Sequence, residues 1–196
     1  RMAERFENTL RDVAYVSGAP TQVPAMSFYL AYHGENDLGL MESLARFYRR
    51  LYPDLTWEAP HCVSPVSCAG RSIRIGVVSR YFGEHAVTWM TYGLMAGLPR
   101  DRFNVIAVTF LSEEENISSR IKDAADNVVF IPKDIQLGRE AIAAQSFDIL
   151  LYADIGMEPL SYYLAFARLA PIQCVTWGHP DTTGLETVDY YISNNL

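Results

Sequence analysis

The stretch that best indicates the fold runs from Ala170 to Gly184 and reads APIQCVTWGHPDTTG. A mostly apolar run, Ile172 to Trp177, stops abruptly at a segment rich in glycine, proline and hydroxyl residues. This pattern is typical of a buried parallel strand whose carboxyl end opens into a loop. Because ligands of open α/β sheets bind at the carboxyl ends of strands, the loop is either part of a ligand site or an ordinary connection.

Strand-like and helix-like segments alternate upstream of this stretch. Strands alternating with helices predict βαβ crossovers and a parallel sheet, so we expect an α/β, Rossmann-like domain with flanking helices. The apolar, strand-like segments are 72–79, 103–110, 127–131, 148–153, 172–177 and 189–193. The segments at helical spacing are 87–98, 137–145, 159–169 and one that starts at Ser112, where Ser112 and Glu115 form a capping box.

Two regions are expected along the chain. A small helical lead-in with a linker covers residues 1–70, and the Rossmann-like domain covers residues 71–196. The prolines and glycine of residues 53–71 predict a loop between them. Since the chain begins at Arg1 and ends at Leu196, directly after a strand-like segment, we expect both regions to belong to something larger.

The lead-in is predicted to be helical. Apolar residues at helical spacing indicate helices over 1–16 and after Asp37, and 26–32 favours a short third helix. No repeat of about 34 residues is visible, so a tetratricopeptide array is not expected here. The helix after Asp37 carries an apolar stripe typical of a packing surface, formed by Leu38, Met41, Ala45, Tyr48 and Tyr52.

The composition indicates the class of protein and makes some partners unexpected. Hydrophobic residues make up 49% of the 196 residues and charged residues 20%, which is typical of a globular domain. The formal net charge is -7 and no long basic run occurs, so nucleic acid is not an expected partner. No apolar stretch is long enough to predict a membrane span, and no signal segment is seen. The sequence has three cysteines, an odd number, and we expect a cytoplasmic location.

Metal and dinucleotide sites find little support. His61, Cys62 and Cys68 are possible zinc ligands, but their spacing matches no standard site and a fourth ligand is missing. Gly76 and Gly83 lack the three-glycine spacing of a dinucleotide-binding loop. We therefore expect neither a metal nor a cofactor.

Two longer segments carry a family resemblance. Phe166 to Gly184 and Ile75 to His85 are similar to the corresponding parts of the O-linked N-acetylglucosamine transferase family, which includes bacterial relatives and N-glycosyltransferases. The similarity covers residues 71–196 well and the helical lead-in more loosely. A string of this length is far more specific than a short glycine motif.

The resemblance implies that residues 71–196 are the amino-terminal lobe of a two-lobed (GT-B) glycosyltransferase, truncated before its second lobe. Such an enzyme moves N-acetylglucosamine or glucose from a UDP-sugar to Ser/Thr or Asn side chains of a protein. The implied partners are the carboxyl-terminal lobe and a polypeptide acceptor. The family needs no metal, in agreement with the lack of an Asp-x-Asp motif, and the fragment alone is expected to be inactive.

Two residues are candidates for the chemistry. His85 follows the first strand, where an imidazole can accept a proton from an acceptor hydroxyl, donate to a phosphate or sugar, or merely cap the helix. The resemblance favours a catalytic role, although Trp89 stands where many eukaryotic members carry a second histidine. Asp154 ends the strand 149–153, where it can orient the acceptor, act as a base, or cap the helix that starts near Pro159.

The loop after Trp177 supplies the candidate substrate-binding residues. By resemblance it borders the donor sugar or its diphosphate, with backbone N–H groups contributing more than the imidazole. The alternative for the histidine is a solvent-exposed loop position. The candidates are Gly178, His179, Pro180, Thr182 and Thr183.

Two other classes of protein remain as alternatives. A non-catalytic protein-interaction module would use the same sheet only as a scaffold. A flavodoxin-type protein would bind a visible cofactor, but no phosphate loop of that type is present.

Overall fold

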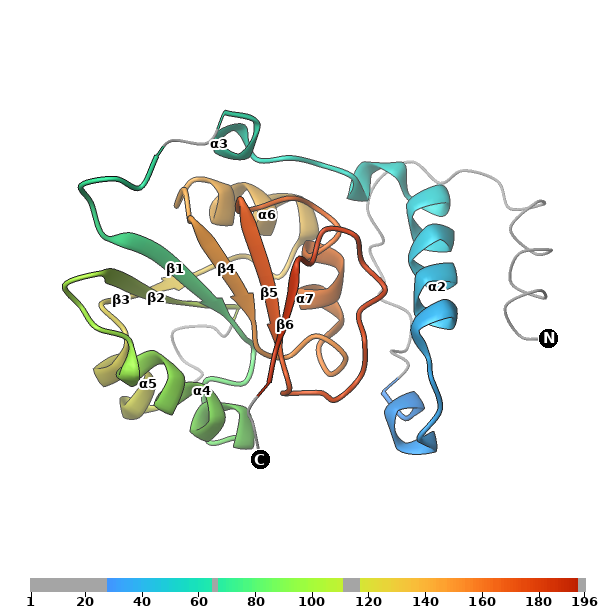
Figure 1. Ribbon diagram of the computed structural model, residues 1–196, viewed down its shortest axis with the longest axis horizontal. Coiled ribbons are helices and arrows are strands. Elements are labelled where there is room, and N and C mark those ends of the chain that lie inside the picture. Colours follow the sequence, from blue (N-terminus) through green and yellow to red (C-terminus); the bar gives the residue numbers. More distant parts are fainter. Residues whose placement is uncertain (1–27, 65–66, 111–116, 194–196) are drawn as a thin grey trace.

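The protein is a six-stranded parallel sheet with helices on both faces (Figure 1). A computed structural model describes residues 28–64, 67–110 and 117–193. All neighbouring strands are parallel, in the order β3-β2-β1-β4-β5-β6, which confirms the predicted Rossmann-like α/β class. The strands are β1 (Ile73–Val78), β2 (Phe103–Thr109), β3 (Asn127–Phe130), β4 (Ile149–Tyr152), β5 (Ile172–Thr176) and β6 (Tyr190–Ile192).

The helices connect these strands and precede them. The predicted helix over 1–16 and the predicted helix start at Ser112 lie outside the described residues. No helix in the described part is both long and apolar enough to cross a membrane. The described helices are η1 (Leu30–His33), α2 (Leu38–Leu51), η2 (Pro53–Leu55), α3 (Pro60–Val63), α4 (Ala86–Gly97), α5 (Ser119–Ala124), α6 (Ile135–Ala143) and α7 (Pro159–Leu164).

Two predictions about these helices were wrong in detail. The segment 53–71 was expected to be a loop, but prolines at the first helical positions start two short helices there, η2 and α3. The helix from Pro159 was expected to reach Leu169, but it ends at Leu164. Beyond it, Arg168 exchanges backbone hydrogen bonds with the linker at Trp57 and Ala59, and this pairing competes with further helix.

The strand order reverses between β1 and β4. The chain builds β1, β2 and β3 outward in one direction and then returns to place β4 on the other side of β1. The chain therefore leaves β1 for α4 on one face of the sheet and leaves β4 for α7 on the other face. In open α/β sheets this point of reversal is where ligands bind.

Each face of the sheet buries its own apolar cluster because side chains alternate along a strand. Val77 and Leu151 face α4 and α5, whereas Val78, Leu150 and Tyr152 face α6, α7 and α2. Figure 1 shows the two helical layers on either side of the strands. The near-continuous apolar strands of the sequence follow from this burial on both faces.

The lead-in helix α2 packs directly on the Rossmann-like domain. Met41, Ala45 and Tyr48 of its predicted stripe are buried and belong to the same apolar cluster as one face of the sheet. The loop before β6 approaches so closely that a Cβ on Gly184 would lie 2.6 Å from the backbone nitrogen of Glu42. The predicted stripe is therefore a packing surface from Met41 to Tyr52, whereas its first residue, Leu38, is 47% exposed.

Substituting Gly184 by alanine tests this close contact. Gly184 has a φ of +65°, which strains other residues, and its added Cβ would also collide with the α2 backbone. We expect Gly184→Ala to lower the free energy of unfolding by roughly 2–4 kcal/mol. Gly39→Ala is the matched control, because Gly39 lies in α2 and a Cβ there meets nothing within 4 Å.

The two variants are compared by urea denaturation followed by circular dichroism. Gly39→Ala should be as stable as wild type or slightly more stable, since alanine favours helix. A Gly184→Ala variant that matched wild type would contradict the described contact.

Candidate functional site

Asp154 joins two loops at the point where the strand order reverses. It lies just beyond the carboxyl end of β4 and has no exposed surface. Its Oδ2 accepts hydrogen bonds from the Ser79 hydroxyl (3.0 Å) and from the Arg80 N–H group (2.7 Å). Since Ser79 and Arg80 directly follow β1, one buried carboxylate fixes the loops of both central strands.

The pKa of Asp154 is raised from 3.8 to about 7, mainly by burial and to a smaller extent by the nearby charge of Glu158. The Ser161 hydroxyl, the Arg80 N–H and the Ser79 hydroxyl oppose the rise. Among the described residues, Asp154 Oδ1 and Ser161 Oγ have no hydrogen bond of standard geometry, although Ser161 is near enough to act on the carboxyl. Asp154 therefore changes charge near neutral pH, in an enclosed position.

The alternative role of Asp154 as the amino-terminal cap of α7 was wrong. Glu158 caps this helix instead, since its carboxylate accepts from the Leu160 N–H group at 3.2 Å. The carbonyl of Asp154 accepts from the N–H groups of Met157 and Glu158, which closes a turn ahead of the helix.

His85 caps α4 on the same side of the sheet. Its Nδ1 accepts from the Val87 N–H group at 3.2 Å, and its ring stacks on Tyr81 with centroids 4.4 Å apart and planes at 24°. The Tyr81 hydroxyl donates to the Met157 carbonyl (3.4 Å) in the loop after β4. His85 thus does act as a helix cap, and its stacking partner is tied to the Asp154 loop.

The loop after β5 packs against the loop after β4. A Cβ on Gly178 would collide with the Ala153 carbonyl, and one on Gly156 would lie 2.5 Å from the His179 ring. His179 is 2% exposed, and its Nε2 donates to the Phe28 carbonyl at 2.9 Å. The alternative of a solvent-exposed loop histidine was therefore wrong, and the imidazole links the lead-in to the β4 and β5 loops.

Thr182 and Thr183 lie elsewhere in the same loop. Thr183 Oγ1 accepts from the Leu185 N–H group (3.2 Å), and the Thr182 N–H group donates to Asp181 (2.7 Å). Both threonines line a pocket of about 400 Å³ between α2 and β6. Pro180 is exposed. No described residue of the loops that directly follow β1 and β4 lines this pocket. The predicted site residues thus fall into two groups.

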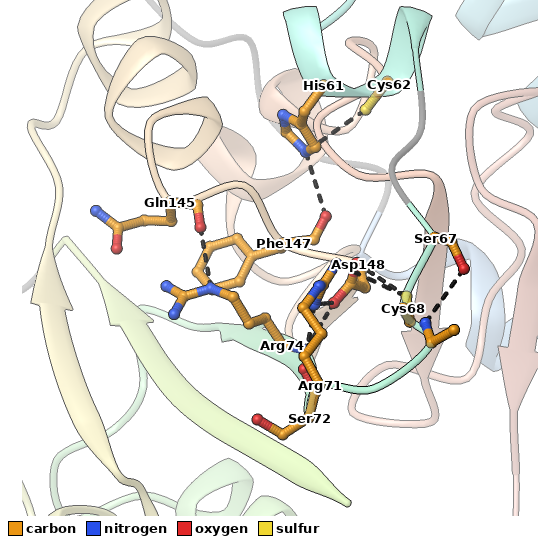
Figure 2. Close-up of polar contacts among 11 residues, drawn as sticks. His61, Cys62, Ser67, Cys68, Arg71, Ser72, Arg74, Gln145, Phe147 and Asp148 are labelled. Atoms are coloured by element: carbon orange, nitrogen blue, oxygen red, sulfur yellow. Dashed lines mark hydrogen bonds and ion pairs between the residues drawn. The ribbon is translucent and has the colours of Figure 1, made fainter.

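A second polar cluster lies at the other end of the central strands, just before β1 and β4 begin (Figure 2). Asp148 accepts two hydrogen bonds of 2.6 Å from the Arg71 guanidinium, one from the Arg74 N–H group (2.8 Å) and one from the Cys68 thiol (3.2 Å). Burial opposes ionisation, but these bonds outweigh it and lower the pKa of Asp148 to about 2. The hydrogen bond to Asp148 raises the pKa of Cys68, so this thiol is a donor. The bonds from Arg71 and Arg74 to Asp148 join the start of β1 to the start of β4.

Figure 2 also shows the three residues that were weighed as possible zinc ligands. His61 Nε2 lies 3.2 Å from the Phe147 carbonyl and 3.7 Å from Cys62 Sγ, whereas Cys68 is directed to Asp148 (Figure 2). Within residues 28–64, 67–110 and 117–193, no three His, Cys, Asp or Glu side chains are grouped so that they could hold a metal ion.

Several residues of the site were missed by the sequence analysis. Ser79 is a hydroxyl residue directly after a strand, which was a usable signal for a site residue. Arg80 acts through its backbone, and its side chain lies 3.6 Å from Glu158, which no spacing pattern indicates. Arg168 falls inside the helix predicted over 159–169, but it lies outside α7 and pairs with Asp189 at 2.6 Å.

Comparison with known proteins finds relatives named as peptide N-acetylglucosaminyltransferases. No family model matches the chain. Proteins of Oryza sativa subsp. japonica and Arabidopsis thaliana, each named a probable UDP-N-acetylglucosamine–peptide N-acetylglucosaminyltransferase SPINDLY, are 28% identical over 156 residues, or 76% of the chain. A UDP-N-acetylglucosamine–peptide N-acetylglucosaminyltransferase of Caenorhabditis elegans is 26% identical over 128 residues, or 64% of the chain. The resemblance to the O-linked N-acetylglucosamine transferase family is confirmed.

The chain spans only a small part of these proteins: 16% of the two plant proteins and 11% of the nematode one. A solved O-GlcNAc transferase variant of Thermobaculum terrenum superposes on 83% of the chain with a TM-score of 0.63 and 22% sequence identity. The chain covers 31% of that structure, and this likeness agrees with the Rossmann-like fold.

The raised pKa of Asp154 predicts a pH dependence of stability. Between about pH 4 and pH 7 the unfolded chain has lost this proton while the folded chain keeps it, so stability falls as pH rises and then levels off. The fall attributable to Asp154 is on the order of 4 kcal/mol. Asp154→Asn, which keeps an acceptor for Ser79 and Arg80, should remove that fall.

Urea denaturation at a series of pH values between 4 and 8 measures this effect. Asp148→Asn is the matched control: the pKa of Asp148 is lowered, so its contribution is lost only as pH falls below about 4. If wild type and Asp154→Asn showed the same slope between pH 4 and 7, the account of Asp154 would be wrong.

Proposed function

We propose that this chain is the amino-terminal, Rossmann-like lobe of a two-lobed (GT-B) glycosyltransferase that moves a sugar from a UDP-sugar to a protein side chain. The donated sugar is N-acetylglucosamine or glucose, and the acceptor is Ser/Thr or Asn. The plant and nematode relatives, which are named as peptide N-acetylglucosaminyltransferases, support this class of reaction.

The observation that carries the proposal is the convergence of the loops after β1, β4 and β5. Their contacts run from Tyr81 to Met157, from Asp154 to Ser79 and from Gly156 to His179. These loops lie at the carboxyl ends of the strands where the strand order reverses, which is where ligands of such sheets bind. Transfer requires that an acceptor atom be held against the anomeric carbon while the departing diphosphate is stabilised.

Each site residue has its own role in this proposal. His85, half-buried at the start of α4, contacts the substrates. Gly178, His179 and Pro180 form the loop that borders the donor, with backbone N–H groups as donors, because the His179 imidazole is buried. Asp154 has no exposed surface for an acceptor, so we assign it the positioning of the loop that carries His85.

Thr182 and Thr183 extend the surface toward α2. Arg46 and Arg49 of α2 line the same pocket as the two threonines. In the proposal this pocket belongs to the face that receives the polypeptide acceptor, while the carboxyl-terminal lobe supplies most nucleotide contacts. The reaction uses no metal and no cofactor and takes place in the cytoplasm.

The full-length parent protein provides the main test. Acceptor peptides containing Ser, Thr or Asn are incubated with several UDP-sugars, and the added sugar mass is read by mass spectrometry. We expect transfer by wild type and a loss of roughly 10- to 100-fold in His85→Ala, because a hydrogen bond to a charged substrate is lost. His61→Ala should retain the wild-type rate, because His61 lies at the amino end of β4, away from the proposed site.

The outcomes separate the proposal from its rival. Failure of the wild-type parent to modify any peptide with any UDP-sugar would favour a non-catalytic interaction module. Equal rates for His85→Ala and wild type would remove His85 from the mechanism.

The isolated chain of 196 residues should bind UDP weakly and show no turnover, since the second lobe is needed for most nucleotide contacts. A radiolabelled UDP-sugar assay measures turnover, and calorimetric titration measures UDP binding. Turnover by the isolated chain would contradict the assignment of the missing contacts to a second lobe.

A further inference from the structure

Exposed aromatic side chains gather beside the loop after β5. Tyr29 and Tyr32, at η1, are 75% and 69% exposed, and their ring centroids are 6.4 Å apart. Phe28, which precedes them, packs on the His179 ring with centroids 4.8 Å apart. In Figure 1, η1 lies at the lower end of the molecule, where the strands also have their carboxyl ends. Two large rings exposed side by side next to a candidate site indicate a binding surface.

The same loop is flanked by exposed rings on its other side. The Tyr191 hydroxyl donates to the His179 carbonyl at 3.3 Å, and Tyr190 and Tyr191 of β6 are both exposed. These two tyrosines line the pocket between α2 and β6. His179 is therefore in contact with aromatic side chains from the lead-in and from β6. We call the four exposed tyrosines the aromatic rim: Tyr29, Tyr32, Tyr190 and Tyr191.

Two carboxylates accompany the aromatic rim. Asp37 stands at the first cap position of α2, yet its carboxylate makes no capping hydrogen bond, and the Leu38 N–H group donates to Asn36 instead (3.2 Å). Asp181 lies in the loop after β5, and its pKa is raised mainly by burial and also by the charge of Asp37. Burial and the charge of Asp181 raise the pKa of Tyr191. Asp181 thus lies within electrostatic reach of both Asp37 and the rim.

Neither carboxylate is paired with a lysine or arginine in the part of the chain that the structure describes. Arg46 and Arg49 line the pocket, but they stand nine and twelve residues beyond Asp37, which is about 13 and 18 Å along the helix. Arg49 also pairs with Glu186 at 2.7 Å. The start of α2 and the loop after β5 therefore present negative charge that no described lysine or arginine neutralises.

This combination of rings and carboxylates fits a cationic side chain. The stem of a lysine or arginine packs on aromatic faces, while its charged head is attracted both by a ring and by a carboxylate. An acidic segment would be repelled by the two aspartates, and a neutral sugar would use the rings but not the charges. Charge complementarity therefore favours a basic peptide over both.

Resting on the proposed glycosyl transfer, we propose that the aromatic rim, together with Asp37 and Asp181, binds a lysine or arginine side chain of the polypeptide acceptor. The rim borders the loop 178–180, so the bound side chain belongs to a residue close to the one that receives the sugar. An extended peptide covers about 10 Å in three residues. The rim takes no part in bond making, so it lowers the KM of acceptors with a basic residue at that position and leaves kcat unchanged.

Matched peptides test this selection on the full-length parent protein. Each peptide has a central Ser, Thr or Asn in an Ala/Gly background, and a single Lys, Ala or Glu is placed in turn at each position near the centre. At one of these positions we expect a KM roughly 3- to 10-fold lower for Lys than for Ala, and a higher KM for Glu, with equal kcat. The preference should shrink as salt is raised from about 50 mM to about 500 mM, because partly exposed charges are screened.

Substitutions identify the surface that selects the peptide. Asp37→Asn combined with Asp181→Asn removes both charges but keeps a capping side chain and the acceptor for the Thr182 N–H group. We expect this double variant to use the Lys and Ala peptides equally well, and Tyr32→Ala to lose part of the preference. Transfer to the Ala peptide at the wild-type rate shows that each variant is folded. Asp101→Asn, in the exposed turn before β2, is the matched control and should keep the full preference.

Two results would overturn the proposal. One is an equal KM for the Lys, Ala and Glu peptides at every position in wild type, and the other is a lysine preference that survives in the double variant. Either result leaves the proposed transfer itself standing.

A measurement of binding needs no transfer. Fluorescence anisotropy compares labelled Lys and Glu peptides on the wild-type parent protein and on the double variant. If wild type transfers no sugar to any peptide, the proposed function fails and anisotropy alone decides about the surface. Tighter binding of the Lys peptide, lost in the double variant, supports a surface for basic peptides, and equal binding overturns it.

Discussion

The site depends on one buried carboxylate between the two central strands. Asp154 stands at the end of β4 and accepts from the hydroxyl and backbone groups that follow β1. Burying a charge is costly unless donors surround it, so the fold can satisfy Asp154 only when the β1 loop takes one particular path. That path places Tyr81 against the β4 loop and His85 at the start of α4. The geometry of the candidate site therefore follows from the two hydrogen bonds that Oδ2 of Asp154 accepts.

This arrangement has a thermodynamic cost that the rest of the domain offsets. The pKa of the Asp154 carboxyl is raised by burial, so this group destabilises the folded state once it ionises. Asp148, at the other end of β4, is surrounded by donors and has a lowered pKa. The two aspartates flank the same strand and have opposite effects on stability. Strained or poorly satisfied groups concentrate at functional sites, and Asp154 has that character while Asp148 has that of a structural clamp.

The fold and the rim of the site were accessible from the sequence because they depend on local patterns. Continuous apolar strands ended by Asp154 and Gly178, and the helix start at His85, follow from the rule for carboxyl ends of parallel strands. What could not be read depends on contacts between distant segments. Arg168 pairs with the linker, and α7 ends earlier than predicted. The buried His179 bonds to the Phe28 carbonyl of the lead-in. Thr183 lines a pocket against α2, apart from the other candidates. No periodicity within a window of a dozen residues reports such contacts.

The seating of the loop before β6 on α2 restricts how the chain length can vary. An α-helix turns by about 100° with each residue, so one residue inserted between Met41 and Tyr48 would rotate half of the buried stripe out of the interior. The insertion would also change the stretch of backbone on which Gly184 rests. An added residue in the exposed turn at Gly34 alters neither relation. The spacing from α2 to the sheet is thus fixed by the buried stripe and by the contact at Gly184, and a residue added at Gly34 leaves this spacing unchanged.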